Sequence, residues 1–250
     1  QMLEHESLFN RIQAGHTLIT GNSRLARVLT GLYNQWRIRG GDRQWTSPTI
    51  ISWNVWLDQL WETAALRGIA GTRRAVPGSR QLISLWETTL KKEKLAQKLL
   101  RPESLATQLR DTRKLVTEWQ LDKKDPAWFG VDNENHAAFY QWNKGFEKHC
   151  EDGGWISPED RTALLCKATG DGLLASVQSL DLIGFDEFTP DQADLISALI
   201  NNGGVACQLT LTPKQDKAVL WKSRDSKHEL VQMARWVRYW FENDPGSTIA

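Results

Sequence analysis

Two adjacent carboxylates, Asp186 and Glu187, stand directly after an apolar run at residues 180–185. An acidic pair at the end of a buried strand can hold a magnesium ion and activate a water molecule, as in nucleoside triphosphatases. Acidic dipeptides are common in proteins, so this pair is a weak signal by itself. Nucleotide hydrolysis also requires a phosphate-binding loop elsewhere in the chain. The predicted site therefore depends on the turn that follows the first strand.

The turn after the first predicted strand, residues 21–27, reads Gly-Asn-Ser-Arg-Leu-Ala-Arg. A phosphate-binding loop needs glycines that let backbone amides approach the phosphates, together with a lysine and a Ser or Thr. This turn has one glycine and no lysine. Ser23 and Arg24 at the helix start could still hold an anion, but an ordinary strand-to-helix turn is favoured. We therefore expect no ATP hydrolysis, disfavour ATP and magnesium as cofactors, and interpret Asp186 and Glu187 as structural remnants.

No other catalytic set emerges from residue spacing. The five histidines are scattered, and no Ser/His/Asp or Cys/His set can be assembled. Cys150, Cys166 and Cys207 are odd in number and widely spaced, which argues against a disulfide framework or a zinc site and favours a reducing compartment. The N-terminus lacks a secretory pattern, and no apolar run approaches the roughly 18 residues of a membrane helix. We expect a cytoplasmic chain with no metal site and no membrane partner.

The net charge of +1 conceals a strongly basic middle section. Residues 67–124 hold fourteen Lys and Arg against six Asp and Glu, whereas residues 125–250 hold eleven against nineteen. Such a stretch is typical of a nucleic-acid face, although solvated helix surfaces explain it equally well. Arg110, Arg113 and Lys114 are spaced for a shared helical face. The candidate DNA-binding cations are Arg73, Arg74, Arg80, Arg110, Arg113 and Lys114.

Thirteen tryptophans are many for a chain of 250 residues. Six of them fall on predicted apolar helix faces, where core packing is favoured over base stacking. Trp45, close to Arg43 and ahead of Pro48, is the one candidate for stacking on a base. The tryptophans assigned to the core are Trp53, Trp56, Trp61, Trp86, Trp119 and Trp142.

The elements that must position these residues alternate between strand and helix. Strands are predicted near residues 16–20, 48–52, 180–185 and 205–211, with another beginning at 248. Helical spacing continues for about a hundred residues between the second and third strands. Ser157 and Thr189 are predicted helix N-caps, Thr189 in a capping box. The pattern indicates an α/β fold with an inserted helical block.

Residues 182–192, Leu-Ile-Gly-Phe-Asp-Glu-Phe-Thr-Pro-Asp-Gln, resemble the Gly-Phe-x-x-Phe-Thr-Pro segment of AddB/RexB-type DNA repair proteins. In that family the segment occupies the position of helicase motif II, and residues 22–27 are similar to an eroded motif I. Ser52-Trp53, residues 81–87 and residues 229–250 resemble further segments of the same group. AddB itself keeps a Gly-rich loop with a lysine, and this chain departs from it there.

The resemblance implies an α/β fold with a RecA-like, P-loop-NTPase-like parallel sheet of the superfamily 1 helicase type. The implied RecA-like subdomain comprises residues 1–54 and 178–250, incomplete at its C-terminus, and residues 55–177 form the inserted helical subdomain. The implied function is that of a helicase-like, ATPase-inactive DNA-binding scaffold in a bacterial repair or recombination nuclease. A PD-(D/E)XK nuclease domain would lie beyond residue 250. The implied partners are DNA, single-stranded or as a duplex end, and a helicase–nuclease partner subunit.

Two other functions stay open. The chain could be a degenerate but active ATP-dependent helicase or nuclease subunit that uses Asp186 and Glu187 on magnesium. It could also be a protein-interaction module without DNA affinity. ATP titration distinguishes the active subunit from an ATPase-inactive scaffold. Salt-dependent DNA binding distinguishes the scaffold from the protein-interaction module.

Overall fold

The computed structural model describes residues 2–3, 5–92, 102–121, 134–174, 179–211 and 222–243. The chain divides into two units, residues 1–212 and residues 213–250, and each is described by itself. None of the described helices combines the length and the apolar character that crossing a bilayer requires.

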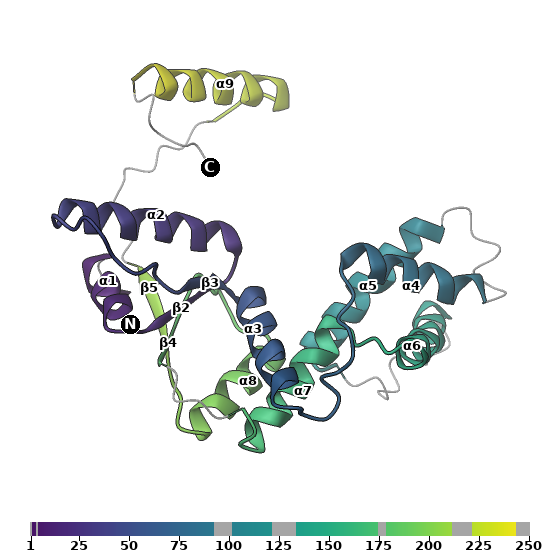
Figure 1. Cartoon of the computed structure of the whole chain (residues 1–250). Helices are drawn as coiled ribbons and strands as arrows, with labels where there is room; N and C mark the ends of the chain where they lie inside the picture. The colour runs from purple at the N-terminus through teal and green to yellow at the C-terminus, as the bar shows by residue number, and fades with distance from the viewer. Residues whose placement is uncertain are drawn as a thin grey trace. The chain divides into compact units, whose positions relative to one another are not determined.

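The first unit is built on a five-stranded, wholly parallel sheet with the order β1-β5-β4-β2-β3 (Figure 1). The central strands bury nearly every residue, as expected for a parallel sheet covered on both faces. Their register pairs Ile19 with Ile51 on one side and with Leu182 on the other. The strands are β1 (Met2–Leu3), β2 (Thr17–Thr20), β3 (Ile50–Ser52), β4 (Ser179–Ile183) and β5 (Val205–Leu211).

Helices cover both faces of the sheet. Helices α1 (His5–Gln13) and α2 (Ser23–Arg39) pack on one face around Leu8, Leu29 and Tyr33. Helices α3 (Trp53–Leu66), α7 (Pro158–Gly170) and α8 (Pro190–Asn201) pack on the other. The connection from β2 to β3 through α2 and the connection from β4 to β5 through α8 therefore lie on opposite faces. Each runs from the centre of the sheet toward a different edge. This arrangement creates a topological switch point between β2 and β4, where α/β proteins commonly bind ligands.

A helical layer lies between β3 and β4 in the sequence. It consists of α4 (Ser79–Lys91), α5 (Pro102–Glu118) and α6 (Glu134–Asp152), which share a separate apolar core. The fully buried Trp86 stacks on Phe146 in this core, with ring centroids 4.3 Å apart. The predicted α/β architecture is therefore confirmed. Of the residues 55–177 assigned to the insertion, α4, α5 and α6 share this separate core, whereas α3 and α7 pack on the sheet.

The predicted N-caps are confirmed. The Ser157 side chain accepts a hydrogen bond from the Asp160 amide, and Thr189 forms the predicted capping box with Gln192. The sequence patterns did not predict β1 and α1, because a two-residue strand is too short to show periodicity. The strand predicted from residue 248 lies outside the described residues.

The second unit contributes one described helix, α9 (Ser226–Asn243). It carries several large apolar side chains that are exposed in the structure, including Leu230, Met233 and Phe241.

Candidate functional site at the carboxyl edge of the sheet

A cleft of about 720 Å³ opens at the carboxyl ends of β2, β3 and β4, beside the switch point. Gly21 follows β2, Asn54 lies in the first turn of α3, and Asp191 lies in the first turn of α8. The opposite wall comes from the turn at residues 76–79 and from α5 and α7. Gln120, just past the end of α5, donates a 2.7 Å hydrogen bond to Asp194 of α8 and so joins the two walls.

The turn between β2 and α2 uses its polar groups internally. Only Gly21 and Asn22 separate the last residue of the strand from the first of the helix. The Asn22 side chain caps α2 by accepting a 2.9 Å hydrogen bond from the Leu25 amide. Thr20 Oγ donates to the Asn22 carbonyl at 2.7 Å. The Leu25 amide, one of those that could cradle a phosphate, is therefore already bonded within the protein.

The β4–α8 loop lies in direct contact with this turn. The Gly21 amide donates a 3.1 Å hydrogen bond to the Ile183 carbonyl. A Cβ atom on Gly21 would overlap the carbonyl oxygen of Gly184, and one on Gly184 would overlap Leu25. Gly184 also has φ +72°, a conformation that favours glycine. The two loops are thus packed backbone to backbone, which requires glycine at both positions.

Ser23 and Arg24 lie in the first turn of α2 and are both exposed. Among the described residues that line the cleft, the β2–α2 turn is represented by Gly21 and not by either of these two. The structure therefore places the candidate anion-binding residues on the surface outside the cleft.

Asp186 and Glu187 are exposed in the loop after β4, while the phenylalanines on either side anchor that loop. Phe185 packs 4.8 Å from Phe188 and 6.0 Å from Trp53, measured between ring centroids. Within the described residues, no group of three or more His, Cys, Asp or Glu side chains is placed to hold a metal ion. The anchored phenylalanines explain why the loop is ordered without any role for its carboxylates.

Charged side chains of both signs line the cleft, and its cations already have acidic partners. Arg110 pairs with Asp111 at 2.8 Å, and Lys114 lies 3.8 Å from Glu118. Arg161 pairs with Asp58. The carboxylates of the lining are Asp58, Asp111, Glu118, Glu159 and Asp191. A polyanion entering this cleft would therefore meet acids beside every lysine and arginine.

Burial raises the pKa of Glu118 to about 7, and the neighbouring Asp191 and Glu159 add to the rise while Lys114 opposes it. Burial is also the largest cause of the raised pKa of Asp191. Carboxylates that face one another in a partly desolvated cleft favour the protonated form. The cleft therefore changes charge close to neutral pH.

We expect the contribution of Glu118 to stability to fall as pH rises from about 4.5 to about 7. The folded pKa of Glu118 lies above its ordinary value of 4.5, so its contribution is full below pH 4.5 and is lost as the pH passes 7. Glu118→Gln should raise the free energy of unfolding at pH 8 by about 1–2 kcal/mol, after allowance for partial exposure. At pH 4 the same substitution should have little effect. Urea unfolding at both pH values measures this.

The matched control is Glu62→Gln, on the exposed face of α3, which should change stability by less than about 0.5 kcal/mol at either pH. Equal effects of Glu118→Gln at pH 4 and pH 8 would contradict the assignment.

The candidate DNA-binding cations differ in their exposure and in their position relative to the cleft. Arg73 and Arg80 are exposed around the turn that forms one rim of the cleft, and Arg110 and Lys114 line its wall. Arg74 is half-buried and donates through Nε to the Gly71 carbonyl at 3.2 Å. The structure thus brings two stretches of basic sequence, about 30 residues apart, to the same cleft.

Arg113 is not on a solvated face, and the prediction that it shares one with Arg110 and Lys114 is wrong. Its side chain is 3% exposed and donates to Asp160 at 2.7 Å, with its guanidinium 5.4 Å from the centre of the Phe146 ring. The helix turns 100° per residue, so Lys114 lies near Arg110 while Arg113 joins the buried stripe of Leu109 and Val116. That spacing is a sequence signal that could have identified it.

Trp45 lies against the core beneath α2 instead of presenting a free ring. Its Nε1 donates a 3.0 Å hydrogen bond to Asn34, and its side chain packs on the α1–α2 cluster. The predicted core positions of Trp53, Trp56, Trp61 and Trp86 are confirmed, Trp142 packs at the edge of the helical core, and Trp119 is 40% exposed.

Two further polar features escaped the sequence patterns. Asp181 in β4 is fully buried and accepts a 2.9 Å hydrogen bond from Arg11 Nε, with His16 Nδ1 at 3.1 Å. The only sequence signal was an acid inside an apolar strand. Burial also raises the pKa of the Cys150 thiol to about 11, which keeps it protonated and unreactive near neutral pH.

No protein-family model and no curated protein matches the sequence. Function is therefore inferred from the residues and geometry of this chain.

Proposed function

We propose that this chain is a helicase-like, RecA-like region of a DNA repair or recombination nuclease that binds DNA and does not turn over ATP. The turn between β2 and α2 carries the ATPase part of the proposal, because it has no lysine and its Gly21 and Leu25 amides are bonded within the protein. The two-residue connection from β2 to α2 supports the same conclusion.

The architecture supports the helicase-like part of the proposal. A parallel sheet with a switch point, and a helical layer inserted after β3, is the arrangement implied by the resemblance to AddB/RexB-type proteins. The loop at residues 184–189, which resembles motif II, follows the strand that pairs directly with β2. A nuclease domain and a partner subunit belong to this proposal through the resemblance alone.

Calorimetric titration with ATP and magnesium is expected to show no binding tighter than about 100 μM, because the turn has no lysine and its Gly21 and Leu25 amides already have partners. The control is Asp186→Asn, which should leave the titration and any residual ATP hydrolysis unchanged. A low-micromolar dissociation constant, or magnesium-dependent hydrolysis that disappears in Asp186→Asn, would favour the active-subunit alternative.

DNA binding is expected to be modest and strongly salt-dependent. Contacts to about three to five phosphates of single-stranded DNA give a slope of about −2 to −3.5 for log K against log salt. Fluorescence anisotropy at 50–200 mM salt measures it. The pairing of Arg110 and Lys114 with acids favours the rival protein-interaction module, which predicts no DNA binding even at about 50 mM salt.

A further inference from the structure

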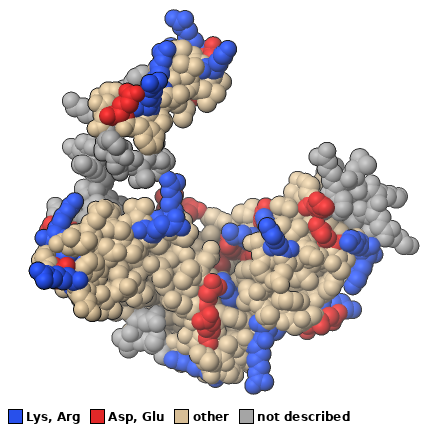
Figure 2. Space-filling model, turned by 45° about the horizontal axis from the view of Figure 1, so that its top comes forward, with Lys and Arg blue, Asp and Glu red and all other residues tan. Residues whose placement is uncertain are grey.

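Helix α2 combines a high density of arginine with a complete lack of acids. Its seventeen residues include Arg24, Arg27, Arg37 and Arg39, and no Asp or Glu. Arg24, Arg27 and Arg39 are exposed, and within the part of the chain that the structure describes no ion pair involves them. Lys and Arg side chains lie over this part of the first unit in Figure 2. The cleft differs, because acids are interleaved with its cations.

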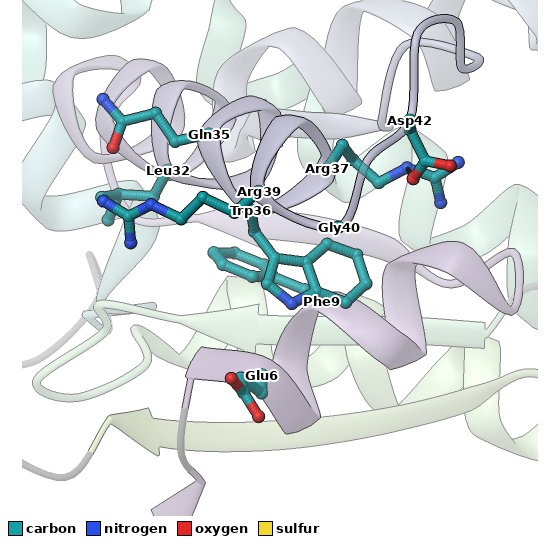
Figure 3. Close-up of a pocket in the computed structure, with 9 residues that line it drawn as sticks. All are labelled: Glu6, Phe9, Leu32, Gln35, Trp36, Arg37, Arg39, Gly40 and Asp42. Carbon is teal, nitrogen blue, oxygen red and sulfur yellow. Dashed lines mark ion pairs between the residues drawn. The ribbon is translucent and has the colours of Figure 1, made fainter.

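A pocket of about 620 Å³ lies between the C-terminal end of α2 and helix α1 (Figure 3). Trp36 lies at its centre over the buried Phe9, with ring centroids 5.6 Å apart. Arg39 and Gln35 come from α2 at one end, and at the other Arg37 is held by Asp42 at 2.8 Å. Glu6 of α1 also lines the pocket, and within the described residues no ion pair joins it to Arg39. The lining is thus an aromatic surface with one unpaired arginine and one carboxylate beside it.

We propose that α2 and this pocket bind single-stranded nucleic acid, with phosphates on Arg24, Arg27 and Arg39 and one base against Trp36. This inference rests on the DNA binding proposed above and assigns its surface and strand type. Arg24 and Arg39 are fifteen residues apart, about 22 Å along the helix, which equals about six stacked nucleotides at 3.4 Å each. At about 100° per residue these two arginines lie about 60° apart around α2, Arg39 on the side of Trp36, whereas Arg27 lies opposite Trp36. A bound strand must therefore pass around the outer side of the helix to contact all three arginines. Non-specific single-strand binding combines such a cationic track with an aromatic stacking platform.

The pocket selects a nucleic-acid strand over other anions. A phosphate or an acidic peptide would pair with the arginines but would not stack on Trp36. A base in a duplex is paired and stacked, so only an unpaired base can enter. Single strands should therefore bind more tightly than duplexes, and part of the affinity should come from the base itself.

The test measures, by fluorescence anisotropy, the affinity of the full chain for three probes. These are a twelve-nucleotide oligo-dT, a duplex of twelve base pairs and an abasic strand of twelve nucleotides. Loss of one stacked base should weaken binding of the abasic strand by about 5- to 150-fold, the range for one base–aromatic stack. Arg24→Gln/Arg27→Gln/Arg39→Gln should reduce the salt slope by about 2 units, at about 0.7 for each phosphate contact. The matched variant is Arg73→Gln/Arg80→Gln/Lys114→Gln, which removes three charges at the cleft and should change the slope less. Circular dichroism melts confirm that both variants fold.

The outcomes separate this inference from the proposed function. If the wild-type chain binds none of the three probes, the DNA-binding function itself fails. If it binds oligo-dT but the α2 variant keeps the full slope, or the cleft variant loses more of it, the DNA lies elsewhere. Equal affinity for the oligo-dT and abasic strands, or tighter binding of the duplex, would overturn the base-binding pocket.

Discussion

Replacing Gly21 with alanine is expected to lower the free energy of unfolding by about 3 kcal/mol or more, beyond the usual cost of overpacking. The added methyl group would overlap the Gly184 carbonyl oxygen, and that oxygen belongs to a backbone held by the parallel pairing of β2 with β4. The neighbouring backbone therefore cannot move aside without loss of strand hydrogen bonds. Urea unfolding followed by far-ultraviolet circular dichroism measures the change.

The matched control is Gly31→Ala, ten residues further along in α2, with open space around the added methyl group. Gly31 lies on the exposed side of α2, where alanine should stabilise the helix by about 1 kcal/mol. If Gly21→Ala proves as harmless as Gly31→Ala, the two loops are not in contact.

Replacing Arg113 with glutamine is expected to destabilise the protein by about 3 kcal/mol, the lower end of the cost of breaking a buried ion pair. The loss includes the packing of the guanidinium on Phe146 and its bond to Asp160. The lower end applies because the partner carboxylates of Asp160 and Glu147 remain 45% and 43% exposed and can be rehydrated. Thermal and urea unfolding check the value.

Arg110→Gln and Lys114→Gln serve as controls, since each changes a partly solvated pair and should shift stability by less than about 0.5 kcal/mol. A coupling energy near zero in a double-mutant cycle of Arg113 and Asp160 would contradict the structural role. Any DNA-binding test that exchanges all three cations together would therefore confuse loss of a contact with loss of the fold.

Local features of the chain were largely decided by the sequence itself. The strand predicted at 180–185 is present as Ser179–Ile183, and the helix predicted from Trp53 is present as Trp53–Leu66. The caps predicted at Ser157 and Thr189 are also present, because periodicity and capping act within a few residues. The lack of Gly-Lys-Ser/Thr after the first strand is likewise a local fact, readable without any tertiary structure.

Long-range pairing could not be read in the same way. Met2 pairs with Thr210, and Arg11 reaches Asp181, across separations for which a single sequence carries no signal. Gly21 and Gly184 each look like ordinary turn glycines until the sheet brings their two loops together. The spacing along α5 groups Arg113 with Leu109 and Val116, but its ion pair with Asp160 and its contact with Phe146 appear only in the tertiary structure. Charge and residue type were thus determined locally, whereas the partners of those charges were decided by packing.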